Sequence, residues 1–282
     1  MRIIRSIPIL GQELAKLRDR KRSIGFVPTM GCLHEGHASL LRRAKKENDI
    51  VVLSIFVNPS QFGPKEDFKK YPRTFKEDVR LAKKEGTDII FSPTINEIYP
   101  QRMQTYVDVP ELSNVLCGKT RPGHFRGVST VVAKLLNIVW PNSLYLGEKD
   151  AQQVQVIKIM VANLNFPVRI KTCPTVREKN GLALSSRNKY LTEIEKKEAA
   201  VLYHSLQEAR KKILAKEKNP KKVIEFISTM ITKNSSGVID YIACVDAEDL
   251  KELSIIQGKI LLALAVKFGK ARLIDNIIFK VS

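Results

Sequence analysis

The chain is poor in cysteine, and it contains no long apolar run. Its four cysteines lie far apart in 282 residues and form no CxxC pair. This usage excludes a disulfide-stapled secreted fold and predicts reduced thiols. The longest apolar runs, such as residues 50–57, fall far short of the ~20 residues that a membrane helix needs. Pro8 and the charged residues after it leave no room for a signal-peptide core. We therefore expect a cytoplasmic protein with no membrane partner.

Acidic residues are few relative to basic ones. The chain has 29 Asp and Glu against 48 Lys and Arg, and its formal charge is +19. Such an excess fits a nucleic-acid binder, an enzyme of anionic substrates, or a lysine-rich composition without functional meaning. The aromatic residues, 7% of the chain, do not alternate with the lysines as a stacking platform for single strands requires. We expect no nucleic-acid partner, and a basic RNA-binding protein remains the alternative from a different class.

Histidine is also scarce, yet two of the four histidines lie three positions apart, at His34 and His37. They follow the apolar run 24–27, with Gly36 between them, and precede an amphipathic stretch. A strand that turns through glycines into a helix offers unpaired N–H groups and the positive end of the helix dipole, which attract phosphate. Two imidazoles at this place can donate hydrogen bonds to the same phosphates.

Two other interpretations of this segment stay open at the level of sequence. Cys32, His34 and His37 together have the side chains of a zinc site, although no further Cys or His lies nearby to complete the set. The histidines can also serve packing alone. The surrounding glycines and Thr29 suit a phosphate better than a metal.

Strand-like and helical patterns alternate through the first part of the chain. The expected strands are 23–27, 50–56, 88–91, 143–146 and 168–172, and the expected helices are 37–46, 74–85, 128–139 and 151–163. Thr74 with Glu77 predicts a capping box, and Gly86 predicts a helix end. This alternation predicts a parallel sheet with helices on both faces, and such sheets bind ligands at the carboxyl ends of their strands.

The pattern changes after residue 175. Thr192 with Glu195 predicts a capping box that opens a long helix to about residue 215, and Pro220 opens a second helix toward residue 232. Three strand-like runs follow at 239–245, 259–267 and 273–279, with no helix of comparable length between them. We therefore expect two domains, residues 1–175 and a smaller α+β unit, 176–282, that closes as a lid.

Three further polar segments are candidates for the same ligand site. Gln61 follows the second strand and offers both a donor and an acceptor. Lys149 follows another strand and can reach a phosphate as a mobile point charge. Ser185, Ser186 and Arg187 place two hydroxyls and a guanidinium near the domain boundary, where they can close over a triphosphate. Each segment is also compatible with an ordinary loop.

Taken together, these segments resemble the motifs of the pantoate–beta-alanine ligase family, the pantothenate synthetases, over essentially the whole chain. The matching segments are PTMGCLHEGH at 28–37, FVNPSQF at 56–62, YPRT at 71–74, RPGHFRGV at 121–128, GEKD at 147–150, LALSSRN at 182–188 and ARLIDN at 271–276. The first and fourth alone occur in many adenylating enzymes, whereas the set is specific.

The resemblance implies a Rossmann-like nucleotidyltransferase domain that binds ATP and pantoate, a smaller C-terminal α+β domain, a homodimer, and the use of Mg²⁺ with ATP. The implied reaction is the ATP-dependent condensation of (R)-pantoate with beta-alanine to pantothenate, AMP and pyrophosphate through a pantoyl adenylate. The nearest alternative is another adenylyl-transfer enzyme of the same superfamily, which leaves AMP attached to its product.

The resemblance also implies roles for individual residues. Those assigned to ATP are Met30, Gly31, Cys32, Leu33, His34, Glu35, Gly36, His37, Gly147, Glu148, Lys149, Asp150, Val176, Leu184, Ser185, Ser186 and Arg187. Gln61 and Gln153 are assigned to pantoate, and Gln61 also to beta-alanine. His37, His34 and Lys149 are the expected catalytic residues. No ligand of Mg²⁺ is assigned.

Overall fold

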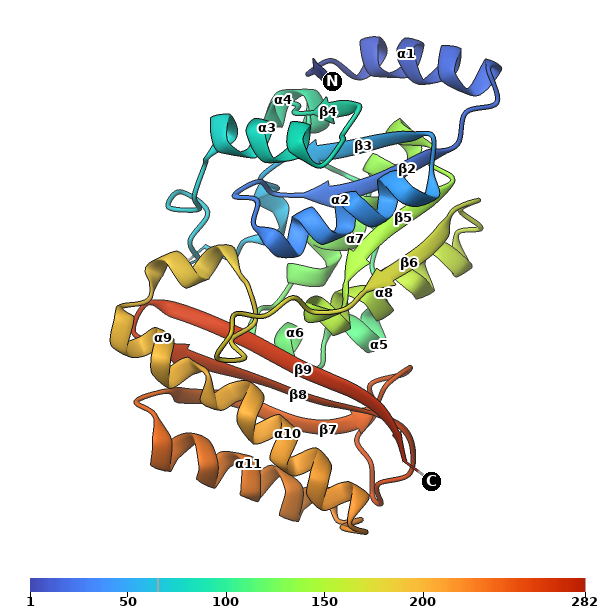
Figure 1. The fold of residues 1–282 in the computed structure, drawn as a ribbon. Coiled ribbons are helices and arrows are strands. Elements are labelled where there is room, and N and C mark those ends of the chain that lie inside the picture. Colours follow the sequence, from blue (N-terminus) through green and yellow to red (C-terminus); the bar gives the residue numbers. More distant parts are fainter. Residues whose placement is uncertain (65, 282) are drawn as a thin grey trace.

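The computed structural model describes residues 1–64 and 66–281, and it contains two separate sheets (Figure 1). The larger sheet has six strands in the order β1-β4-β3-β2-β5-β6, and all of its neighbours pair in parallel. Its strands are β1 (Arg2–Ile4), β2 (Ile24–Thr29), β3 (Ile50–Ile55), β4 (Ile89–Phe91), β5 (Ser143–Gly147) and β6 (Arg169–Cys173). Because the strand order reverses between β2 and β5, the carboxyl ends of these two strands form the ligand-binding edge.

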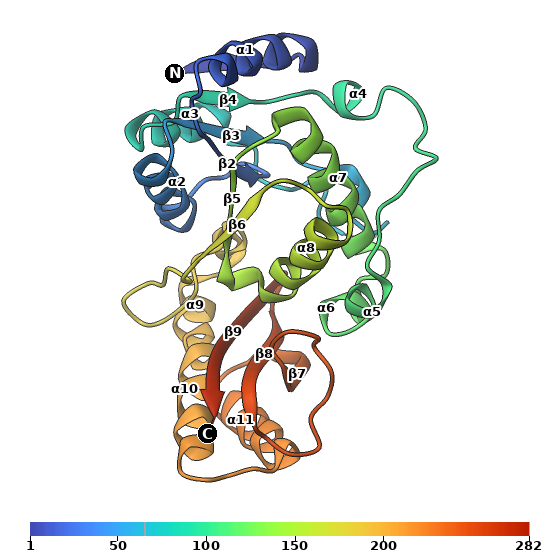
Figure 2. The same cartoon turned by 90° about the vertical axis from the view of Figure 1, so that its right-hand side faces the viewer.

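Helices cover both faces of this sheet (Figure 2). The long helices are α1 (Ile7–Asp19), α2 (Glu35–Glu47), α3 (Phe75–Lys84), α7 (His124–Val139) and α8 (Ala151–Asn163). Short segments complete the connections: η1 (Pro59–Gln61), α4 (Ile95–Ile98), α5 (Pro110–Ser113), α6 (Cys117–Thr120) and η2 (Glu148–Asp150). Helices α2 and α3 pack on one face, whereas α1, α7 and α8 pack on the other.

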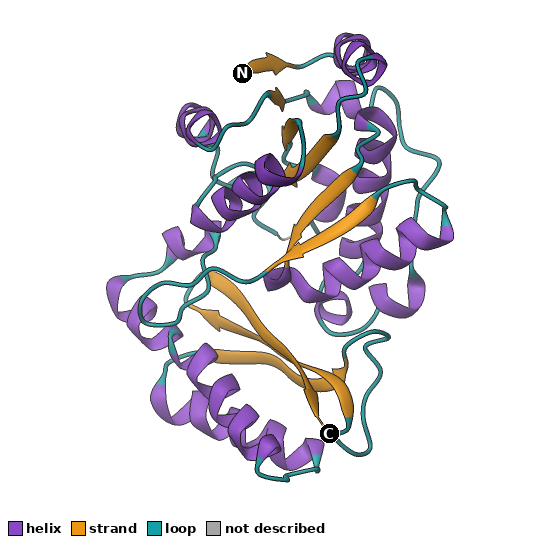
Figure 3. Cartoon of the chain, turned by 45° about the vertical axis from the view of Figure 1, so that its right-hand side comes forward, coloured by secondary structure: helices purple, strands orange, loops and turns teal. Residues whose placement is uncertain are grey.

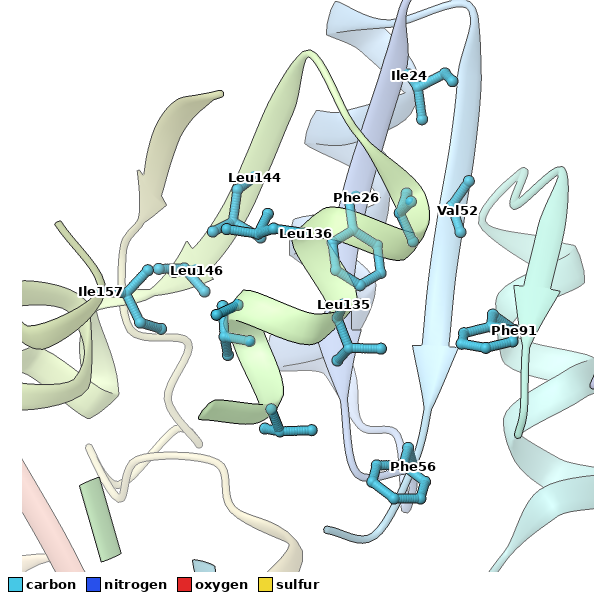
Figure 4. Packing of buried hydrophobic residues seen from close by; sticks show 14 of the residues in the cluster. Ile24, Phe26, Val52, Phe56, Phe91, Leu135, Leu136, Leu144, Leu146 and Ile157 are labelled. Atoms are coloured by element: carbon cyan, nitrogen blue, oxygen red, sulfur yellow. The ribbon is translucent and has the colours of Figure 1, made fainter. Parts of the chain in front are cut away.

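The central strands are apolar throughout because both of their faces are buried. In β2, Phe26 points into the core shared with α7, and the next residue, Val27, points into the core shared with α2. In β3, Val52 joins Phe26, and its neighbour Leu53 joins Val27. Figure 4 shows Phe26 and Val52 against the inner face of α7. The polar residues that follow these strands are therefore held by a rigid, two-sided core.

The smaller sheet is antiparallel and lies between its own helices and the first unit (Figure 3). Its strands are β7 (Val238–Asp246), β8 (Gly258–Phe268) and β9 (Ala271–Val281), and they are preceded by η3 (Ser186–Tyr190), α9 (Glu193–Ala199), α10 (Val201–Leu214) and α11 (Pro220–Asn234). Along β8, Leu262 and Leu264 face the helices, whereas Leu261 and Ala263 face a cluster that includes Phe125 of the first unit. This sheet is thus apolar on both faces.

The structure confirms the predicted fold class and most of the elements, with ends shifted by a few residues. The pattern did not predict β1 or α1. The long helix expected from Thr192 is wrong, because the chain breaks at Ala200 into α9 and α10, although the Thr192–Glu195 capping box is present. The Thr74–Glu77 capping box is also wrong: the Thr74 hydroxyl bonds the buried carboxylate of Asp78 instead.

The predicted domain boundary near residue 175 stays a prediction. The loop from Pro174 onward leads from the parallel sheet to the second core, whose members begin at Leu182. Within the described part of the chain, no helix combines the length and the apolar character needed to cross a bilayer.

The apolar stripe of α7 should carry much of the stability of the larger unit. Leu136 lies in this stripe and is 2% exposed, whereas its neighbour Asn137 faces solvent. We expect Leu136→Ala to lower the free energy of unfolding by about 2–5 kcal/mol, because it leaves a cavity in a packed core. Asn137→Ala, the matched control in the same helix, should change it by less than ~0.5 kcal/mol. Urea unfolding of both variants measures the difference, and equal effects would contradict the assigned core.

Candidate active site

The polar segments that follow β2, β3 and β5 converge on one cavity of about 240 Å³ at the carboxyl edge of the parallel sheet. The predicted site residues on its wall are Met30, His34, Gly36, His37, Gln61, Gly147, Lys149, Asp150, Gln153, Val176, Leu184, Ser185, Ser186 and Arg187. A second cavity of about 420 Å³ adjoins it toward β8 and β9 and shares Lys149, Gln153 and Arg187. Residues far apart in sequence therefore line one composite cleft.

Five residues of the predicted set lie in the turns around the cavity rather than on its wall: Gly31, Cys32, Leu33, Glu35 and Glu148. Cys32 is buried beneath the turn, and the Glu35 carboxylate pairs with Arg42 on the outer side of α2. These residues form the turns that shape the site, and their assignment to ATP stays a prediction.

The turn after β2 is built on a buried acid that sequence reasoning missed. Asp78 of α3 is 2% exposed, and its carboxylate accepts hydrogen bonds from the main-chain N–H of Cys32 (3.0 Å) and of Leu33 (2.8 Å). Gly31 has φ +81°, and a Cβ there would lie 2.9 Å from an Asp78 oxygen. One feature of the sequence could have pointed to this role. Asp78 is an acid on the apolar face of α3, four residues after the N-cap residue Thr74.

The two histidines cap the first turn of α2 reciprocally. The Nδ1 atom of His34 accepts from Gly36 N–H (3.2 Å), and the Nδ1 atom of His37 accepts from His34 N–H (3.3 Å). The rings lie 4.2 Å apart, and a Cβ on Gly36 would collide with the His34 ring at 2.9 Å. Since both Nδ1 atoms accept, each neutral ring carries its proton on Nε2 and keeps that donor for a ligand.

Both imidazoles are neutral at physiological pH. Burial lowers the pKa of His34 to about 4, with a further contribution from the Lys149 ammonium. Burial and the neighbouring His34 ring hold the pKa of His37 well below its ordinary value. The pair therefore presents two uncharged donors at the positive end of a helix, an arrangement that suits a phosphate.

This geometry does not favour the zinc alternative. Nδ1 of each imidazole already accepts a main-chain hydrogen bond, and Cys32 is buried. Across residues 1–64 and 66–281, no three His, Cys, Asp or Glu side chains are grouped as a metal ion requires.

Gln61 lies on the opposite wall, at the end of η1. Its Oε1 accepts from the buried amide of Asn58 (3.0 Å), and its Nε2 reaches the Met30 sulfur at 3.2 Å. Helix α7 approaches η1 so closely that a Cβ on Gly127 would lie 2.2 Å from the Ser60 carbonyl oxygen. The Gln61 amide is thus oriented before any ligand arrives, and its weakly held N–H group can turn to an acceptor on a substrate.

The first residue of α7, His124, and the loop before it hold the main chain of Gln61. The Nη1 group of Arg121 donates to Nε2 of His124 (3.0 Å), so the His124 proton is on Nδ1, which donates to the Gln61 carbonyl (2.8 Å). Arg121 also forms two bonds of 2.7 Å to Glu66. Burial and the Arg121 charge lower the pKa of His124 to about 4. Arg126 points away from the site, over the Tyr106 ring.

The third wall comes from the C-terminal part of the chain. Ser186 donates to the Cys32 carbonyl (3.2 Å), and Arg187 pairs with Asp67 (3.0 Å). Across the cavity, the ammonium of Lys149 lies 3.6 Å from the Asp150 carboxylate. Serine hydroxyls and a guanidinium therefore face the histidine pair and Lys149 around a single space.

A parallel α/β sheet whose strand order reverses beside a cavity lined with polar donors is typical of Rossmann-like proteins that bind nucleotides at this edge. The model of the pantoate-beta-alanine ligase family matches residues 2–278. The chain belongs to this family, as the motifs indicated.

Curated relatives and solved structures agree with this assignment. The pantothenate synthetase of Acetivibrio thermocellus is 51% identical over 281 residues and covers 100% of both chains. That of Thermotoga neapolitana is 50% identical over 278 residues, 99% of each chain. The solved Thermus thermophilus enzyme has a TM-score of 0.93 at 42% identity, covering 98% of this chain and 99% of its own. The Francisella tularensis ligase, solved with Beta-gamma ATP and Beta-alanine, has a TM-score of 0.80 at 39% identity and covers 99% and 97%.

The depressed pKa of His34 predicts a specific loss of stability in acid. An unfolded histidine titrates near 6.5 but folded His34 near 4, so between these values the unfolded state binds more protons. The free energy of unfolding should therefore fall as the pH drops from about 6.5 to about 4. His34→Asn keeps a capping acceptor but does not titrate. The free energy of unfolding of this variant should therefore change less with pH over the same range. Denaturant unfolding across pH tests this; His204→Asn, at an exposed position, is the control. Parallel curves for wild type and His34→Asn would contradict it.

Proposed function

We propose that the protein condenses (R)-pantoate with beta-alanine at the expense of ATP, releasing pantothenate, AMP and pyrophosphate. Family membership across the chain supports the reaction. The observation that carries the site assignment is the ring of donors around one cavity: two neutral Nε2–H groups, the Lys149 ammonium and the Ser185–Arg187 segment, with Gln61 and Gln153 on the remaining wall.

In the first step, a pantoate carboxylate oxygen attacks the α-phosphorus of ATP. A P–O bond forms to pantoate as the bond to the β-phosphate oxygen breaks, and pyrophosphate leaves with that electron pair. Charge grows on the leaving group, so donors from His34, His37 and Lys149 stabilise the transition state more than the ground state. The mechanism needs no protein nucleophile.

In the second step, the neutral amine of beta-alanine attacks the carbonyl carbon of the mixed anhydride. The C–N bond forms, the C–O bond to the phosphate breaks, AMP leaves with the electron pair, and the nitrogen releases a proton to solvent. This step mostly requires alignment and exclusion of water. Gln61 is suited to the alignment because Asn58 fixes its amide and His124 fixes its main chain.

Mg²⁺ would enter with the triphosphate and would neutralise part of its charge. Magnesium is commonly held by one or two carboxylates together with substrate phosphates. The Asp150 side chain fits this requirement because it borders both cavities and is 47% exposed. We also propose a cytoplasmic homodimer; the four free, buried cysteines suit a reducing compartment.

Removal of either key donor should abolish most turnover. We expect His37→Ala and Lys149→Ala each to lower kcat by on the order of a hundredfold or more, because each donor acts on charge that develops in the transition state. The assay follows AMP release with ATP, pantoate and beta-alanine present or omitted in turn. His204→Ala, at an exposed position of α10, should stay within a few fold of wild type. Near-normal turnover in either site variant would remove it from the mechanism.

A separate adenylate step predicts isotope exchange without the amine. With pantoate, ATP and Mg²⁺ but no beta-alanine, the enzyme should exchange labelled pyrophosphate into ATP, because the first step is complete and reversible. Omission of pantoate should abolish the exchange. Gln61→Ala should weaken it, since loss of one polar contact to pantoate costs about 1–3 kcal/mol. Exchange that requires beta-alanine would point to a concerted reaction.

A further inference from the structure

The segment Ala271–Asn276 has no role in the reaction described above, yet its last two residues reach the ATP cleft. Strand β9 places Asp275 and Asn276 where the antiparallel sheet meets the parallel one. Their exposed fractions are 3% and 7%, respectively. Two buried polar side chains at such a junction need partners, and both have them in segments that line the cleft.

The side-chain amide of Asn276 donates hydrogen bonds to two consecutive main-chain carbonyls in the turn that carries Lys149. Its Nδ2 donates to the main-chain oxygen of Glu148 (3.0 Å) and to that of Lys149 (2.8 Å). These carbonyls belong to η2, the short segment between β5 and α8. Because Lys149 has a long, flexible side chain, the position of its main chain decides which region its ammonium can reach.

Asp275 holds the other phosphate-facing segment. Its carboxylate accepts two bonds from Arg177, at 2.6 and 2.8 Å, and one from the Asn276 N–H at 2.7 Å. Arg177 in turn donates to the Gly181 carbonyl (3.1 Å) and stacks on the Tyr203 ring at 3.7 Å. Arg177 and Ala183 form an isolated bridge, so this contact sets the start of the loop that delivers Ser185 and Arg187.

We propose that Asn276 is a positioning residue for the reaction: from the C-terminal sheet, it holds the Glu148–Lys149 turn so that Lys149 meets the departing phosphates. The inference rests on the proposed function, because Lys149 must act on phosphate for its position to matter. Asp275 braces Asn276 and joins this turn to the Ser185–Arg187 loop. The motif thus couples two walls of the cleft through its bonds to the Glu148–Lys149 turn and to Arg177.

A double-mutant cycle with Lys149 tests the proposal. Asn276→Ala should lower kcat on the order of tenfold or more in the wild-type background, with a smaller change in the KM for pantoate. In the Lys149→Ala background the same substitution should change kcat less than twofold, because the group it positions is gone. Should Asn276→Ala not fold, Asn276→Ser carries the same cycle. Amide hydrogen exchange of residues 147–151 should accelerate in the Asn276 variant but not in Lys149→Ala.

Asn219→Ala is the matched control. The Asn219 side chain also accepts hydrogen bonds from two consecutive main-chain groups, Lys221 N–H (2.9 Å) and Lys222 N–H (3.4 Å). These bonds lie at the N-terminal end of α11. The Asn219→Ala substitution should lower the melting temperature. It should leave kcat within twofold in both the wild-type and the Lys149→Ala backgrounds. If Asn276→Ala lowers kcat by the same factor with and without the Lys149 side chain, the positioning role of Asn276 is wrong. The role proposed for Lys149 would be unaffected by that result. Full activity of Lys149→Ala would instead overturn the role proposed for Lys149, and the inference with it.

Discussion

One buried carboxylate fixes the turn on which the rest of the site depends. Asp78 accepts two main-chain N–H groups of the loop between β2 and α2, and it has displaced the local cap expected at the start of α3. A buried carboxylate is stable only when hydrogen bonds satisfy it, so the acid and the tight turn stabilise each other. The start of α2, and with it the orientation of His34 and His37, follows from this contact.

The cations on the wall of the first cavity differ in how firmly an acidic partner holds them. Arg121 is held by Glu66 and Arg187 by Asp67, with the closest N–O distances at 2.7 and 3.0 Å. Lys149 is 3.6 Å from Asp150, beyond the range of a strong hydrogen bond. An incoming phosphate therefore competes with a weak partner at Lys149 and with strong ones at the arginines. The guanidinium groups shape the walls, whereas the lysine is able to follow charge as it moves.

The sequence predicted the parallel sheet and the place of the candidate site because both depend on local signals. Apolar runs marked β2, β3 and β5, and polar segments directly after them marked the carboxyl edge. The pairing of Asp78 with the turn at Gly31 was not predictable, since it joins residues 45 and 46 positions apart through side-chain geometry. The break at Ala200 was missed for the opposite reason: alanine is a good helix former, so the local pattern continued through it. The roles of Glu66 and Asp67 also depend on partners distant in sequence.

The two-sided burial of β8 restricts how the C-terminal unit can move. Its Leu261 and Ala263 pack into a cluster with Phe125, Ala151 and Val156, so swinging the whole sheet away would expose apolar surface at about 25 cal/mol per Å². The polar bonds of Asn276 lie beside this cluster and would break in the same motion. Opening of the cleft is therefore least costly in the segment between Val176 and Arg187, which contacts the first motif through single side chains rather than through a packed core. The antiparallel sheet forms one wall of the cleft, from which that loop extends, and closure of residues 176–282 as a lid stays a prediction.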